Sequence, residues 1–191
     1  MKGKLEGNMT KVYVFLADGF EEIEGLAVVD LLRRADIETT MISVMDTVEI
    51  LGGHGIVVSA DKVFEEVSFD DVDMLVLPGG TTGVKNLRKH VELCDRIKQF
   101  DEEEKMIGAI CAAPTMLHEL GILDGKNATC YQSLADKLAN ATYIDANVVV
   151  DEHIMTSQGF GTSIDFGLAI VEHFKGKEEA AKLADEVMYK R

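Results

Sequence analysis

One cysteine stands where a buried strand is expected to turn into a helix. Cys111 follows the apolar run 106–110 and precedes small residues and Pro114, a residue that favours the first turn of a helix. Ala109 and Ala113, two positions before and after it, are as small as the tight turn of a nucleophile elbow requires. The helix dipole favours a thiolate there, so Cys111 is expected to be reactive, with a lowered pKa. The alternative is a buried structural thiol.

Two other stretches could supply groups that act on this thiol. Gly79 and Gly80 end the apolar stretch 73–77. With the amide of Ala112, their N–H groups could form an oxyanion hole, although a turn that needs positive φ would explain the same glycines. Glu24 lies about one turn into the helix expected after the first strand, where a protonated carboxyl could donate a hydrogen bond to a thiolate. From its spacing alone, Glu24 is better explained as a solvated residue that complements the helix dipole.

The elements expected around these residues alternate between strands and helices. Strands are expected at 11–17, 39–44, 73–77, 106–110, 128–131, 147–150 and 153–156, with short strands or a hairpin in 55–59 and 62–64. Helices are expected at 21–35, in parts of 84–100, and at 112–120, 133–138, 161–174 and 178–189. Several strands are apolar on both faces, which predicts an α/β fold with a mainly parallel sheet covered by helices on both sides. Ligands of such sheets bind at the carboxyl ends of the strands.

Composition limits the classes of partner. The net charge of −15 argues against nonspecific binding to nucleic acid and against anionic membrane surfaces, and no apolar run is long enough to span a bilayer. Three cysteines without a CxxC pair, together with the absence of a signal peptide, indicate a cytoplasmic protein. Five histidines without metal-ligand spacing predict no metal site. Residues 1–9 are expected to be a tag-like or disordered leader, and 10–191 a single domain.

Four stretches, taken in order and with their spacing, resemble the ThiJ/PfpI superfamily, in the branch of Parkinson disease protein seven (the DJ family) and the bacterial YajL chaperone/deglycase. They are DGFEEIEGLAVVDLLRRA (18–35), LVLPGG (75–80), GAICAAPTML (108–117) and SQGFGTSIDFGLAIVE (157–172). The similarity covers nearly all of residues 10–191. It implies a flavodoxin-like fold, the three-layer α/β/α sandwich of class I glutamine amidotransferases, a homodimer, and no cofactor.

The resemblance also implies roles for four residues. Cys111 matches the family's nucleophile and Glu24 its thiol-contacting glutamate, while the amides of Gly80 and Ala112 match its oxyanion-binding backbone. The resemblance therefore favours a functional Glu24 over a solvated one.

Several positions depart from the family pattern or rank lower as candidates. Ala112 stands where the protease-like branch has histidine, which argues against a peptidase or amidase. Tyr131 stands where animal members have histidine, and Phe160 replaces the proline of SQGPGT in the pocket wall. The resemblance places His54 near the dimer interface, facing the partner's site, although a plain surface histidine explains it more simply. Cys130 could be a resolving thiol, but a buried bystander is the better explanation.

Two functions follow from this interpretation. The first is a cofactor-independent, cysteine-dependent glyoxalase or deglycase that acts on methylglyoxal and related reactive carbonyls, with Cys111 attacking the aldehyde and Glu24 moving a proton. The second is a non-catalytic oxidative-stress sensor or redox-regulated chaperone, in which Cys111 is oxidised to a sulfinic acid. Turnover distinguishes the two, because a sensor is consumed stoichiometrically.

Overall fold

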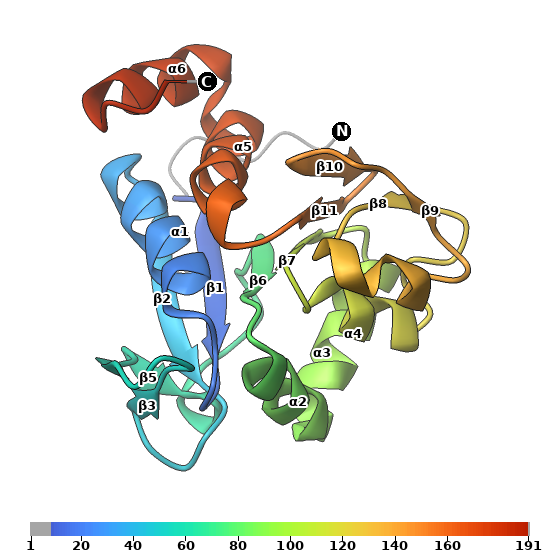
Figure 1. The fold of residues 1–191 in the computed structure, drawn as a ribbon. Coiled ribbons are helices and arrows are strands. Elements are labelled where there is room, and N and C mark those ends of the chain that lie inside the picture. Colours follow the sequence, from blue (N-terminus) through green and yellow to red (C-terminus); the bar gives the residue numbers. More distant parts are fainter. Residues whose placement is uncertain (1–8, 191) are drawn as a thin grey trace.

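A computed structural model describes residues 9–190 and shows a three-layer α/β/α sandwich around a seven-stranded sheet (Figure 1). The order of the strands in the sheet is β10-β11-β7-β6-β1-β2-β5, and all neighbours are parallel except β10 and β11. These strands are β1 (Lys11–Leu16), β2 (Glu38–Ser43), β5 (Lys62–Val63), β6 (Met74–Leu77), β7 (Met106–Ile110), β10 (Val148–Asp151) and β11 (Ile154–Ser157). The predicted fold class is confirmed.

Helices cover both faces of the sheet. They are α1 (Glu22–Arg34), α2 (Thr81–Lys89), α3 (Val91–Glu102), α4 (Pro114–Glu119), α5 (Ser163–Lys175) and α6 (Lys177–Glu186). One hydrophobic core lies between the sheet and α2, α3 and α4, and the other between the sheet and α1, α5 and α6. In β1, Tyr13 and Phe15 contribute to the first core and Val12, Val14 and Leu16 to the second, which explains why this strand is apolar on both faces.

Shorter elements lie outside the central sheet. Strands β3 (Glu49–Leu51) and β4 (Val57–Ser59) form an antiparallel hairpin, and β8 (Asn127–Ala128) pairs with β9 (Thr142–Tyr143). Short 3₁₀ helices are found at η1 (Phe64–Glu66), η2 (Gln132–Lys137) and η3 (Phe160–Thr162). Within residues 9–190, no helix has both the length and the apolar character that crossing a bilayer requires.

The stretch 84–100 is helical in parts, as expected: it belongs to two helices, because His90 adopts an extended conformation between them. The expected strand at 128–131 differs from the structure. The stretch 128–131 is not a continuous strand, because the amide of Thr129 binds the hydroxyl of Thr156, 2.9 Å away, instead of a strand backbone. The expected leader 1–9 lies outside the described residues except for Met9.

Candidate functional site

The site residues lie at the carboxyl ends of three neighbouring strands. Cys111 follows β7 directly, Gly79 and Gly80 follow β6, and Glu24 lies in the first turn of the helix that follows β1. Because β1, β6 and β7 are adjacent and parallel, their carboxyl ends meet at one edge of the sheet. The three stretches that are far apart in the sequence therefore converge.

The backbone of Cys111 is held in an unusual conformation. Its φ is +65°, a region that costs a non-glycine residue about 1–2 kcal/mol. Two hydrogen bonds hold it there: its N–H donates to the carbonyl of Ser157 at 3.0 Å, and its carbonyl accepts from the N–H of Tyr131 at 2.9 Å. A residue with this backbone strain at a strand-to-helix turn has the geometry of a nucleophile elbow.

Glu24 is almost completely buried beside this cysteine, with an exposed fraction of 1%. It lies on the sheet-facing side of α1, one turn before Val28 and in line with Leu31 and Leu32, which are also buried. Ile23, its neighbour in α1, is exposed. A helical stripe drawn through Glu24, Val28 and Leu32 would have placed Glu24 on the core-facing side from the sequence alone.

Gly79 allows Glu24 and Cys111 to meet. Its N–H donates to Oε2 of Glu24 at 2.9 Å. A Cβ at position 79 would lie 2.2 Å from that oxygen and 2.5 Å from Cβ of Cys111, so no other residue fits without moving one of the two side chains. Gly80 has φ of +87° and a Cβ there would lie 2.4 Å from the carbonyl oxygen of Gly19. Both glycines are required by close approach.

The carboxyl and the thiol are hydrogen-bonded to each other, and both have raised pKa values. Burial raises the pKa of Glu24 to about 7, against the lowering effect of hydrogen bonds from Cys111, Gly79 and Phe160. Burial, the nearby charge of Glu24 and the hydrogen bond to it together raise the pKa of the Cys111 thiol to about 12. The amides of Gly80 and Ala112 act in the opposite direction and stabilise the thiolate.

The expectation of a lowered thiol pKa is therefore wrong for the state in which Glu24 is ionised. Helix α4 begins only at Pro114 and has six residues, so its dipole is short and starts beyond Cys111. Burial and a neighbouring carboxylate outweigh it. When Glu24 is protonated, the repulsion disappears and the carboxyl becomes a donor, so the thiolate is favoured only when Glu24 holds the proton.

A recess of about 360 Å³ borders this pair. Its lining includes the exposed rings of Tyr131 and Phe160, together with Gly159. A Cβ at Gly159 would lie 3.5 Å from Oε1 of Glu24 and 3.8 Å from Cβ of Cys111, which shows how close the recess comes to the carboxyl and the thiol. Sequence reasoning had named Tyr131 and Phe160 as pocket residues but missed Gly159, the third residue of SQGFGT.

His54 lies outside this recess, against a different glutamate. Its Nδ1 is 2.9 Å from Oε2 of Glu22, and its backbone N–H donates to Oε1 of Glu22 at 2.7 Å. The ring is exposed, and the hydrogen bond to Glu22 raises the pKa of His54. Glu21, Glu22 and His54 could offer three metal-ligand atoms within 4.8 Å of one another, but the ion pair already accounts for this arrangement.

Within the described part of the chain, the two other cysteines are free thiols without a carboxyl partner like Glu24. Cys130 is buried, its thiol donates to the carbonyl of Tyr131 at 3.4 Å, and burial raises its pKa to about 11. Cys94 is half-buried in α3, and burial also raises its pKa. No polar group comparable to Glu24 is hydrogen-bonded to either thiol among the contacts of residues 9–190.

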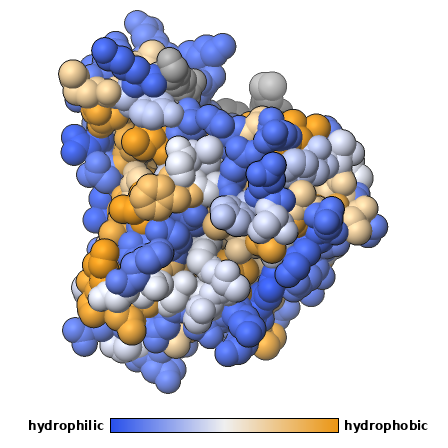
Figure 2. All heavy atoms as spheres, in the orientation of Figure 1, coloured by the Kyte–Doolittle hydropathy of each residue, from blue (hydrophilic) through white to orange (hydrophobic). Residues whose placement is uncertain are grey.

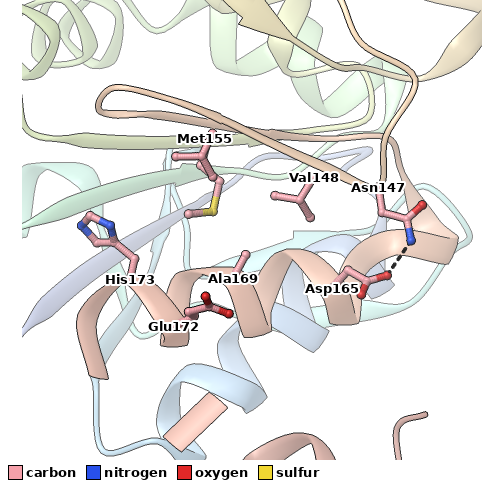
Figure 3. Close-up of a pocket in the computed structure, with 8 residues that line it drawn as sticks. Asn147, Val148, Met155, Asp165, Ala169, Glu172 and His173 are labelled. Carbon is pink, nitrogen blue, oxygen red and sulfur yellow. Dashed lines mark hydrogen bonds between the residues drawn. The ribbon is translucent and has the colours of Figure 1, made fainter. Parts of the chain in front are cut away.

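A larger cavity, of about 450 Å³, lies away from Cys111, between the β10–β11 hairpin and α5 (Figure 3). Val148 and Met155 line it from the hairpin and Ala169 from the helix, and Asn147 donates to Asp165 at 2.9 Å at one end. Its lining within residues 9–190 contains no cysteine. Sequence reasoning did not find this cavity, because its residues form no motif.

Comparison with known proteins gives the family. The DJ-1/PfpI family pattern matches residues 10–173. Protein DJ-1 homolog B of Arabidopsis thaliana is 35% identical over 175 residues, which are 91% of this chain and 40% of that protein. The chain thus spans about two fifths of the length of that relative.

Two further relatives match over nearly their whole length. The glutathione-independent glyoxalase DJR-1.2 of Caenorhabditis elegans is 31% identical over 165 residues, covering 85% of this chain and 87% of that protein. The structure of oxidized Toxoplasma gondii DJ-1 has a TM-score of 0.91 and 34% sequence identity, and the match covers 95% of this chain and 100% of that one. On the family pattern, the sequence identity and the shared fold, the chain belongs to the DJ-1/PfpI family.

Proposed function

We propose that the protein is a cofactor-independent, cysteine-dependent glyoxalase or deglycase that acts on methylglyoxal and related reactive carbonyls. The observation that carries the proposal is the buried, hydrogen-bonded pair of Cys111 and Glu24, with two amide donors beside the sulfur. Such a pair combines a nucleophile with a proton carrier, and one relative is named a glutathione-independent glyoxalase.

The first step is addition of the thiolate to the aldehyde. The sulfur of Cys111 forms a bond to the aldehyde carbon, and the carbonyl π electrons move to the oxygen. The amides of Gly80 and Ala112 stabilise the resulting oxyanion, and the proton of Glu24 converts it to a hemithioacetal. This order suits the site, because the thiolate is favoured only while Glu24 is protonated.

The later steps use the same carboxylate as a base. Glu24 removes the proton from the carbon bonded to sulfur, which gives an enediol, and returns a proton to the neighbouring carbon to leave a thioester. Hydrolysis by water releases the 2-hydroxy acid and the free thiol. A pKa of about 7 suits both directions of transfer near neutral pH, so Glu24 can act where no histidine stands beside Cys111.

The test is lactate production from methylglyoxal by freshly reduced protein. Cys111→Ser and Glu24→Gln are expected to lose multiple turnover, by about 10²–10⁴ for the loss of the acid–base group. Cys94→Ser is the control for a half-buried thiol outside the site and should keep wild-type activity. Turnover that survives in either site variant, or none in the wild type, would reject the proposal.

A redox sensor or chaperone is the second candidate function. The protonated carboxyl of Glu24 and the amides of Gly80 and Ala112 could hold a sulfinate at Cys111 as well as an oxyanion. The T. gondii relative was described in an oxidized form. A protein that reacts once with peroxide at Cys111 and shows no turnover of methylglyoxal would favour this function.

We also propose a homodimer, supported by an exposed apolar patch around the β3–β4 hairpin. Its residues are Ile23, Leu51, Ile56 and Val57, with exposed fractions of 41–61%. Figure 2 shows hydrophobic side chains along the side of the molecule that carries α1 and this hairpin. Leu51→Glu is expected to shift the mass measured by light scattering from dimer to monomer, while Val91→Glu, on the other face, should not. A wild-type monomer would reject the dimer.

A further inference from the structure

Two amides that stabilise the thiolate of Cys111 come from different helices. The amide of Gly80 belongs to the N-cap residue of α2, and the amide of Ala112 lies in the turn that leads into α4. Both can bind one sulfur or one oxyanion only if α2 and α4 keep a fixed separation, because hydrogen bonds weaken with small displacements. A contact between the two helices is therefore relevant to the chemistry.

Arg88, in the last turn of α2, makes such a contact. Its Nη2 donates to the hydroxyl of Thr115 in the first turn of α4, at 2.5 Å. That hydroxyl donates in turn to the carbonyl of Ala112 at 2.7 Å, and the N–H of Thr115 donates to the same carbonyl at 3.1 Å. A chain of hydrogen bonds therefore runs from α2 to the carbonyl of Ala112, the residue whose N–H lies beside the Cys111 sulfur.

The chemistry of the two side chains fixes the direction of this chain. A guanidinium has only donors, so the Thr115 oxygen must accept from it, and the single hydroxyl hydrogen is left for the Ala112 carbonyl. Thr115 is buried, with an exposed fraction of 4%, so no water competes for the hydroxyl. Glu119 lies 3.0 Å from Nε of Arg88 without a well-aligned hydrogen bond, and its exposure limits what that ion pair contributes.

We propose that Arg88 is a positioning residue for the nucleophile: through Thr115 it sets the position of the Ala112 amide relative to the Gly80 amide. It touches neither Cys111 nor the recess among the contacts of residues 9–190. The inference rests on the proposed role of Cys111 as a nucleophile, but not on the identity of the substrate.

The experiment measures the pH dependence of alkylation of Cys111 by iodoacetamide, followed by mass spectrometry of the Cys111 peptide. Arg88→Met is expected to move the midpoint to higher pH and to slow alkylation about tenfold at neutral pH, because a misplaced Ala112 amide no longer lowers the pKa of the thiol. Thr115→Val should give the same change. In the double variant the two shifts in midpoint should not add, because both substitutions break the same chain of hydrogen bonds.

Three controls separate positioning from stability. Arg34→Met removes an exposed arginine that is paired with Asp30 on α1, and it should leave the profile unchanged. Thr115→Ser keeps both hydrogen bonds and should resemble the wild type, and Arg88→Lys should restore part of the shift. Profiles of Arg88→Met and Thr115→Val that superimpose on the wild type, with only a lower melting temperature, would overturn the proposal.

The outcome is independent of turnover. A shifted profile in a protein that does not convert methylglyoxal would support the role of Arg88 and reject the proposed enzyme. An unchanged profile in a protein that does convert methylglyoxal would reject the role of Arg88 alone.

Discussion

Two glutamates at the start of α1 are almost equally inaccessible to solvent, but their pKa values are shifted in opposite directions. Glu22 has an exposed fraction of 2% and Glu24 of 1%. Burial tends to raise both pKa values, but hydrogen bonds from His54 and from the backbone bring the pKa of Glu22 below its ordinary value, whereas that of Glu24 rises to about 7. Depth and partners together decide the charge of each carboxyl. Glu22 lies just beneath the exposed ring of His54, whose hydrogen bond lowers its pKa, whereas Glu24 lies deep beside Cys111, where desolvation outweighs its hydrogen bonds.

The largest effect is expected from a substitution that separates Glu24 from Cys111 and from the amide of Gly79. Gly79→Ala would put a methyl group 2.2 Å from Oε2 of Glu24 and 2.5 Å from Cβ of Cys111. Displacement of reacting groups by about 1 Å costs about 10²-fold in rate, so turnover of methylglyoxal should fall by about that factor.

Gly121→Ala is the control for a change that affects only stability. Gly121 has φ of +81° and no atom within 4 Å of a built Cβ, so the variant loses about 1 kcal/mol of stability through backbone strain. Its turnover should equal that of the wild type. If Gly79→Ala also keeps wild-type turnover, the pair is not the reactive centre.

The pH dependence of stability should separate the two glutamates. The pKa of Glu24 is raised in the folded state to about 7 from 4.5, so the free energy of unfolding should fall as pH rises from 4.5 to 7, by at most about 3 kcal/mol. Glu22, with its lowered pKa, contributes stability above pH 4.5 that is lost at lower pH. Urea denaturation between about pH 3 and about pH 8 measures both slopes.

Matched glutamine variants show which glutamate causes each change in the free energy of unfolding with pH. Glu24→Gln should flatten the decrease between pH 4.5 and 7, and Glu22→Gln should leave it in place. A decrease that persists in Glu24→Gln would show that another group causes it.

The same variants sharpen the comparison at the thiol. Glu24→Gln removes the charge that helps to raise the pKa of Cys111, so the pKa should fall from about 12 and alkylation at neutral pH should become faster, even though turnover is lost. Glu22→Gln should not change the pKa of Cys111. Thiolate absorbance against pH checks both expectations, and an equal effect of the two variants would mean that the charge acts at long range.

Sequence reasoning placed the main elements of this site and missed its electrostatics. Cys111 at an elbow followed from the small residues at 109 and 113, and the parallel sheet followed from strands that are apolar on both faces. The raised pKa of the thiol did not follow, because it depends on burial beneath segments that are distant in the sequence. The helical spacing of Glu24 from Val28 and Leu32 could have predicted that Glu24 faces the core. Its position in the first turn alone did not distinguish it from Glu22.

The smallest expected effect tests whether the Glu22–His54 pair is independent of the Glu24–Cys111 pair. His54→Ala removes the ring that is 2.9 Å from Glu22, so the pKa of Glu22 should rise. At pH values above about 5, where Glu22 is ionised, the melting temperature should be slightly lower than that of the wild type. Because the ring is exposed, water replaces part of the lost hydrogen bond and the change should be small. Alkylation of Cys111 should match the wild type, since His54 does not line the recess. A changed alkylation rate would mean that the two glutamates are coupled through the first turn of α1, and the contrast between them would then describe one network instead of two independent sites.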